Sequence, residues 1–180
     1  VEHSTDRGEV KRGLRYFTGG TVQGYDGRRM LEAAAHRFSH DLELARWVYE
    51  RDPESERTQA LLLSNLIDEP LSPLRFELHR RRFERHRGET DLDTCLRCIR
   101  ESVVNIEASL NFIDALVPVE LRRHQKLIFG ALRALGAYGQ LANLIQRMLC
   151  DTSNAIEVSD LSRELAMIRY GHLSDPTGAL

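Results

Sequence analysis

Apolar and polar positions follow a helical period through most of this chain, beginning at about Arg28. The clearest example is the stretch His40–Ser55, where apolar residues recur on one face before Pro53 ends the pattern. The stretch Arg57–Asp91 contains two such runs, separated by a turn that prolines mark. Strand-like alternation with a period of two is absent. The pattern therefore predicts an all-α protein.

Caps, prolines and glycines divide this pattern into successive helices. Residues 1–27 are polar and dotted with glycine, which predicts an extended N-terminal arm. Residues 28–170 are predicted to form the helical domain, and residues 171–180 a C-terminal tail. The predicted helices span Arg28–Phe38, Asp41–Arg51, Glu56–Ile67, Pro73–His86, Leu92–Glu101, Ile106–Leu116, Val119–Leu135, Tyr138–Cys150 and Val158–Tyr170.

The predicted helices group into units of similar length. We expect antiparallel helical hairpins at about Gly27–Glu56, Arg57–Asp91, Leu92–Arg123 and His124–Ala155. Units of this size fall within the range of helical solenoids, so the fold expected is an array of hairpins, a short α-solenoid. An irregular helical bundle is the alternative, because it would give the same sequence of helices.

Composition narrows the possible classes of protein. The chain has 180 residues, 42% of them hydrophobic and 29% charged, which fits a globular domain or a short repeat array. No apolar run reaches the length of a membrane-spanning helix, so no membrane partner is expected. The net charge of −2 means that nucleic-acid binding would need a local basic patch. The three cysteines are too few for a disulfide framework and suit a reducing compartment.

One segment is strongly basic. The predicted helix RFELHRRRFERHR carries clustered guanidinium groups, which can neutralise phosphates and release counterions. A second cluster, which includes His124, would extend this surface if the hairpins stack in order. The alternative is a solvated helix face whose arginines pair with nearby carboxylates, including Glu77, Glu84, Asp91 and Asp93. The residues predicted to contact RNA are Arg75, Arg80, Arg81, Arg82, Arg85, Arg87, Arg122, Arg123 and Lys126.

Cysteines and histidines give weaker indications of chemistry. Cys95 and Cys98 form a C-x-x-C inside a predicted helix, which favours buried core cysteines over a zinc site completed by His86. His36 and His40 have the i, i+4 spacing that can present two imidazoles to a metal, although a histidine pair on a helix surface is the simpler interpretation. We find no phosphate-binding loop or nucleophile motif, and therefore predict no catalytic residues, metal or cofactor.

Two stretches carry a resemblance to a known family. The sequences DLELARWVYERDPES (Asp41–Ser55) and GALRALGAYGQLANLIQRML (Gly130–Leu149) resemble the helices of a degenerate pentatricopeptide repeat protein. The resemblance implies an array of helix–turn–helix units in an organelle, commonly acting on single-stranded RNA. The positions that would read a base hold apolar residues or glycine, at Ala60 or Leu61 and at Phe129 or Gly130. Contact with an RNA backbone or a protein surface is therefore expected rather than base readout.

Three hypotheses for function follow. The first is a non-enzymatic helical-repeat subunit of an organellar ribonucleoprotein, such as the mitochondrial ribosome or an RNA-processing complex, which contacts RNA and neighbouring proteins. Its predicted location is the mitochondrion. The second is a protein–protein scaffold of the same fold without RNA contact. The third is a helical-bundle metal protein or enzyme that uses His36, His40 and His86.

Overall fold

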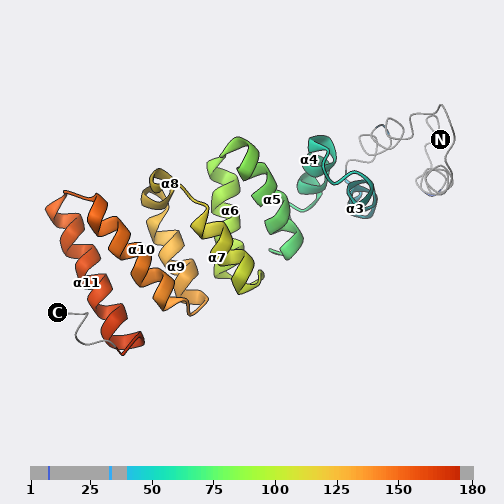
Figure 1. Cartoon of the computed structure of the whole chain (residues 1–180). Helices are drawn as coiled ribbons and strands as arrows, with labels where there is room; N and C mark the ends of the chain where they lie inside the picture. The colour runs from blue at the N-terminus through green and yellow to red at the C-terminus, as the bar shows by residue number, and fades with distance from the viewer. Residues whose placement is uncertain (1–7, 9–32, 34–39, 175–180) are drawn as a thin grey trace. The chain divides into compact units, whose positions relative to one another are not determined.

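The computed structural model describes residues 40–174 together with the single positions Gly8 and Ala33. The predicted N-terminal arm, the predicted helix Arg28–Phe38 and residues 175–180 therefore lie outside the described residues, apart from those two positions. Within residues 40–174 the elements are helices and loops with no strand, which confirms the prediction of an all-α fold (Figure 1). The helices of this range are α3 (Leu42–Arg51), α4 (Glu56–Asn65), α5 (Pro73–His86), α6 (Glu89–Arg100), α7 (Ile106–Asp114), α8 (Pro118–Arg123), α9 (Gln125–Ala134), α10 (Tyr138–Asp151) and α11 (Ala155–His172).

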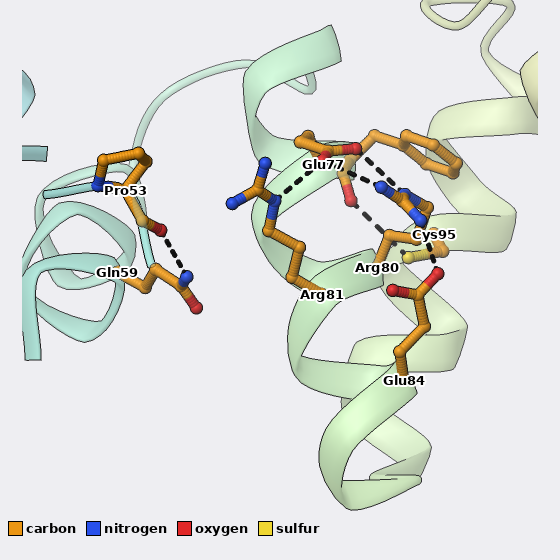
Figure 2. Close-up of polar contacts among 8 residues, drawn as sticks. Pro53, Gln59, Glu77, Arg80, Arg81, Glu84 and Cys95 are labelled. Carbon is orange, nitrogen blue, oxygen red and sulfur yellow. Dashed lines mark hydrogen bonds and ion pairs between the residues drawn. The ribbon is translucent and has the colours of Figure 1, made fainter. Parts of the chain in front are cut away.

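The chain divides into two compact units at Pro70 and Leu71. The predicted domain 28–170 spans both units. In the first unit, α3 packs on α4. The loop between them is held by side chains of α4, because the Thr58 hydroxyl donates to the carbonyl of Asp52 at 2.6 Å. Gln59 is fully buried, and its amide donates to the carbonyl of Pro53 at 2.6 Å (Figure 2).

In the second unit, α5 and α6 form an antiparallel hairpin joined by only two residues. His79 of α5 meets Asp91 of α6, and one turn earlier on α5 the carbonyl of Phe76 meets the thiol of Cys95. As the residue number rises on one helix it falls on the other, which defines antiparallel packing. The hairpin of α10 and α11 follows the same rule, since Tyr138 at the start of α10 stacks on His172 at the end of α11.

The α6 and α9 helices, by contrast, pack in parallel. The side chain of Asp93 lies beside His124 just before α9, and further along Arg100 lies beside Gly130, where a Cβ would be 3.9 Å from the arginine Cδ. Equivalent helices of successive hairpins run parallel in a helical array, so this packing agrees with the predicted array of hairpins. Figure 1 shows the helices of this unit following one another from α5 to α11.

A continuous apolar core joins these helices. Phe112 of α7 packs edge-on against two rings of α5, with centroid distances of 5.6 Å to Phe76 and 5.7 Å to Phe83. Edge-to-face geometry of this kind stabilises a pair beyond the area that it buries. Deeper in the unit, α6, α9 and α10 contribute side chains with almost no exposed surface: Leu92, Leu96, Ile99, Ile128, Leu132, Leu141 and Ile145.

The predicted phase of the hairpins is wrong by one helix. The expected unit Arg57–Asp91 joins α4 to α5, but α5 packs on α6, and the boundary between the compact units falls inside the expected hairpin. The expected unit His124–Ala155 likewise joins α9 to α10, whereas the closest packing of α10 is with α11. Apolar periodicity locates each helix, but α4, α5, α6, α9, α10 and α11 all bury apolar residues, so each could pack on the helix before it or on the helix after it. The pattern therefore does not decide which neighbour is the partner.

The predicted helix Val119–Leu135 is also wrong, because it is two helices. The backbone leaves helical geometry at His124, which has φ −106° and ψ 18°. A carboxylate of Glu120 accepts from the amide of Val117 at 2.9 Å, which caps the short helix α8. The break lets α8 turn away while α9 continues along α6.

The ring of Phe112 should be a major source of stability in the second unit. We expect Phe112→Ala to lower the free energy of unfolding by about 3–5 kcal/mol, because it removes a buried ring and leaves a cavity beside Phe76 and Phe83. Chemical denaturation followed by circular dichroism measures this change. Asn111→Ala alters the neighbouring exposed position and should change stability by less than about 0.5 kcal/mol. Equal effects of the two substitutions would contradict the packing described.

Candidate functional site

The arginine-rich helix α5 is the candidate site that the sequence indicates. The helix begins at Pro73, whose ring fixes a backbone φ angle suited to the first helical turn. The side chain of Ser72 caps this turn by accepting a hydrogen bond from the amide of Arg75 at 3.2 Å. Phe76 and Phe83 are buried on the face toward the core. The arginines of α5 therefore lie on the sides of the helix that face away from this core.

A compact network of charges occupies the middle of α5. Arg80 makes a two-pronged contact with Glu77, in which its Nε and Nη2 donate to the two carboxylate oxygens at 2.9 and 2.8 Å. Arg81 donates to the same carboxylate at 2.8 Å, and Arg80 also binds Glu84 (Figure 2). Burial opposes ionisation of Glu77, but the hydrogen bonds and charges of the two arginines outweigh it and lower its pKa. The hydrogen bond that Arg80 donates to Glu77 raises the pKa of Arg80, although burial opposes this shift.

A second, more buried group links α5 to the first turn of α6. The Nδ1 of His79 lies 2.6 Å from a carboxylate oxygen of Asp91, and both side chains are about nine-tenths buried. The Nε of Arg82 lies 3.7 Å from the other oxygen of Asp91. Burial lowers the pKa of His79 more than Asp91 raises it, so the imidazole is neutral at pH 7 and donates to the carboxylate. These contacts hold the hairpin together at its closed end.

The end of α5 is held by a contact with α8. Arg87 adopts a left-handed backbone with φ 52°, a conformation in which glycine is more usual, and its amide donates to the carbonyl of Phe83 at 2.8 Å. The guanidinium of Arg87 lies 5.0 Å from the centroid of the Phe83 ring, within range of a cation–π contact. Its Nη1 is also 3.4 Å from both carboxylate oxygens of Glu120. A second contact of α8 is the ion pair between Arg123 and Glu89 at the start of α6.

The structure brings the second predicted basic cluster to this same end of α5. Arg122 donates to the backbone carbonyl of Asp151 at 2.9 Å. The Nδ1 of His124 lies 3.0 Å from a carboxylate oxygen of Asp93, within ion-pair range. The side chain of Lys126 is exposed and forms no ion pair with the described residues. The other two predicted RNA contacts, Arg75 and Arg85, are half-buried and exposed respectively.

These contacts agree with the alternative raised by the sequence, a helix face whose arginines pair with carboxylates. Of the carboxylates named from the sequence, Glu77, Glu84 and Asp91 lie in ion-pair range of arginines of α5, and Asp93 lies beside His124. Glu89 and Glu120 could not be predicted as partners from the sequence, because each lies more than thirty positions from its arginine and only the packing of α8 brings the pairs together. RNA binding by the arginines stays a prediction.

A groove between α5 and α7 was not predicted from the sequence. It encloses about 310 Å³ and is lined by aromatic rings and charged side chains, with small or polar residues on the α7 side. The aromatic residues are Phe76, Phe83 and Phe112, the charged ones are Glu77, Arg80, Glu84 and Arg87, and the others are Ala108, Asn111 and Ala115, the last of which directly follows α7. The acidic and basic side chains at its edge balance one another, so the groove has no strong preference for an anion or a cation.

The cysteines of α6 are core residues, which confirms the interpretation of the C-x-x-C favoured above. Both Cys95 and Cys98 have no exposed surface. Burial raises the pKa of Cys95 strongly and the pKa of Cys98 to about 11, so both remain protonated thiols at neutral pH. His86, the histidine considered as a further zinc ligand, is exposed at the end of α5.

Metal and membrane sites can be assessed only for the described residues. In that part of the chain, no three histidine, cysteine, aspartate or glutamate side chains gather in a way that could hold a metal ion. His36, one of the two spaced histidines, lies outside the described residues, and His40 is exposed. None of the described helices combines the length and the apolar character that crossing a membrane requires.

Comparisons with known proteins find no matching family model, no similar curated protein and no similar solved structure. The resemblance to pentatricopeptide repeats is therefore reduced to the coarser statement that the chain is all-helical with sequentially packed helices.

The lowered pKa of His79 predicts a pH dependence of stability. As pH falls below 6.5, histidine in the unfolded chain gains a proton while buried His79 resists protonation, so the unfolded state is favoured. We expect the free energy of unfolding to fall in this range by up to about 1.4 kcal/mol per pH unit from this residue. His79→Gln should reduce that slope. An identical slope for the variant and the unchanged chain would contradict a neutral, buried His79.

Thiol reactivity should separate the three cysteines. Cys150 is exposed, whereas Cys95 and Cys98 are buried with raised pKa values. We expect one equivalent of thiol to react rapidly with a disulfide reagent in the folded protein and all three to react in denaturant. In Cys150→Ser the rapid equivalent should disappear. Rapid reaction of that variant in its folded state would show that the α6 cysteines are accessible.

Proposed function

We propose that this chain is a non-catalytic subunit of a larger assembly, in which its helical array acts as a scaffold for protein partners. The observation that supports this proposal best is the pairing of the arginine-rich helix. Arg80, Arg81, Arg82 and Arg87 each face a carboxylate of the same chain, at Glu77, Glu84, Asp91 or Glu120.

This pairing weakens the case for α5 as a surface for RNA. A phosphate group would have to displace a carboxylate that is held next to the guanidinium by the fold. Displacement would also leave a partly buried carboxylate such as Glu77, whose printed ion-pair partners are both arginines of α5, without those partners, which is unfavourable. Polyanion binding draws its salt-dependent affinity from counterions released by cationic groups. An arginine that is already neutralised by the protein has fewer counterions to release.

Exposed apolar side chains favour protein partners. Ile106 at the start of α7 is 55% exposed, and Val119 on α8 is 65% exposed. Ile156, Met167 and Tyr170 are also exposed along α11. Methionine and aromatic side chains are enriched in protein–protein interfaces, and apolar residues that gather on one surface mark sites of association.

Contact with RNA is the second candidate, in a mitochondrial ribonucleoprotein as the sequence resemblance implies. Arg97 of α6 and Lys126 of α9 support it, because both are exposed and neither forms an ion pair with the described residues. Both residues lie on the adjacent, parallel helices α6 and α9. Two unneutralised cations at this place could bind a phosphate backbone without base specificity.

Salt-dependent RNA binding distinguishes these candidates. We expect the triple variant Arg80→Ala, Arg81→Ala and Arg82→Ala to bind a generic single-stranded RNA as weakly as the unchanged chain, because these arginines are neutralised by carboxylates. The measurement is fluorescence anisotropy at salt concentrations between about 50 and 200 mM. A clear loss of affinity in the triple variant would contradict the scaffold proposal and restore α5 as the RNA-binding surface.

The double variant Arg97→Ala and Lys126→Ala is the matched control for the second candidate. If these residues bind phosphates, the slope of log affinity against log salt concentration should become shallower by about 1.4, the change expected for the loss of two single-strand phosphate contacts.

A second experiment captures partners with the tagged full chain from native extract, with and without ribonuclease. Protein partners that survive ribonuclease treatment support the scaffold, and their loss favours the ribonucleoprotein.

A further inference from the structure

The outer face of α11 carries a seam that no described residue covers. Ile156, Met167 and Tyr170 lie on this face and are 75%, 65% and 75% exposed. The buried residues of the helix, including Leu161 and Leu165, lie on the opposite side and pack toward α10. The α11 helix therefore has two apolar faces, of which only one is buried within the described part of the chain.

The positions of the exposed face follow the spacing of a coiled coil. The α11 seam consists of Ile156, Asp160, Arg163, Met167 and Tyr170, which are separated by four, three, four and three residues. Alternation of this kind is the a and d pattern of a heptad, in which side chains form one stripe along a helix and pack against a partner helix. The seam thus has the form of a helix–helix interface rather than a scatter of apolar residues.

The two charged positions at the centre of the seam restrict what can cover it. Asp160 and Arg163 are 70% and 73% exposed, and their charged atoms are 3.9 Å apart, at the limit of an ion pair. Surface pairs of this length contribute little to stability. Both groups are therefore available to a partner that presents an arginine opposite Asp160 and a carboxylate opposite Arg163.

We propose that the occupant of the α11 seam is the α11 seam of a second copy of this chain, paired antiparallel about a two-fold axis. Antiparallel coiled-coil packing sets an a position of one helix against a d position of the other. In this arrangement Asp160 meets Arg163 of the second copy, and Met167 meets Ile156 of the second copy. The two-fold axis repeats each contact, so the part of the seam from Ile156 to Met167 is self-complementary as an isologous interface must be, and Tyr170 lies beyond the paired positions.

The charges exclude the parallel alternative. A parallel pair would place Asp160 against Asp160 and Arg163 against Arg163 of the second copy, and like charges in contact across an interface oppose association. A polar residue in a heptad core lowers affinity but fixes the register and orientation of the helices. The central pair therefore acts as the specificity element of the interface, and the apolar residues on either side supply the attraction.

Dimerisation through this seam is weak. A single helix face buries less area than the roughly 800 Å² per partner of a standard interface, so we expect dimerisation only at raised protein concentration. The inference shares the exposed apolar residues of α11 with the proposed function, which also draws on the paired arginines of α5 and on exposed apolar residues of α7 and α8. A monomeric chain would overturn the dimer and leave the capture of other protein partners unaffected.

Charge reversal at the seam tests the dimer. Sedimentation equilibrium of the full chain at increasing concentration should show reversible dimerisation. Asp160→Arg and Arg163→Asp should each weaken the dimer at least tenfold, since each variant sets like charges against one another. The double variant Asp160→Arg with Arg163→Asp exchanges the two charges and should restore association. Ser162→Arg, on the same helix outside the seam, should have no effect.

Circular dichroism verifies that these variants, all at exposed positions, keep their helices. Failure of the double variant to restore a dimer that both single variants had lost would overturn the proposal. A chain that stays monomeric at the highest concentration, or a dimer unaffected by either single reversal, would overturn it equally.

Crosslinking tests the orientation. In chains that also carry Cys150→Ser, Ile156→Cys and Met167→Cys place new thiols at positions that face each other only between antiparallel copies. A mixture of the two variants should form a disulfide between unlike chains, because disulfides require Cα atoms within about 7 Å. Each variant alone should remain uncrosslinked. Crosslinking of each variant with itself would indicate parallel helices and would overturn the antiparallel arrangement.

Discussion

The packing of α6 between α5 and α9 is the constraint on which the second unit depends. The α6 helix buries side chains toward both neighbours, and Leu92, Leu96 and Ile99 are almost fully enclosed. Cys95 and Cys98 occupy the same buried surface, where a small apolar side chain allows close approach. The C-x-x-C therefore results from a helix that must pack on two sides, which is sufficient to explain the pair without metal or redox chemistry.

Burial of α6 has an electrostatic consequence for α5. The first turn of α6 places Asp91 in the interface, where an isolated carboxylate would be costly. His79 and Arg82 of α5 provide its partners. On the same helix, Glu77 and Glu84 form ion pairs with Arg80. The basic residues of α5 thus contribute to the folding of the hairpin. An arginine-rich helix is an ambiguous sign of nucleic-acid binding, because the same residues satisfy the carboxylates of a densely packed helical array.

The sequence predicted individual helices well where local signals mark both ends. The range Pro73–His86 was predicted at both boundaries, because Ser72 and Pro73 begin the helix and Gly88 follows its end. The phase of the hairpins and the break at His124 were not predictable, since they depend on which apolar faces meet. The ion pairs of the candidate site divide in the same way. Glu77 and Glu84 lie one turn from Arg80 and could be anticipated, whereas Glu120 reaches Arg87 only through the packing of α8.

The α11 helix shows how one segment can carry information about folding and about association. Its inner face, with Leu161 and Leu165, is buried and packs against α10. Its outer face is apolar at both ends and charged in the middle. Because apolar residues occupy opposite sides, the sequence of α11 has little overall amphipathicity, and its second face is hidden from a search for one apolar stripe. A wholly apolar outer face would accept partner helices in either direction. The charged Asp160 and Arg163 at the centre reduce the apolar attraction of this face. They also restrict the partner to a helix that presents opposite charges in reverse order, and a second α11 meets this condition.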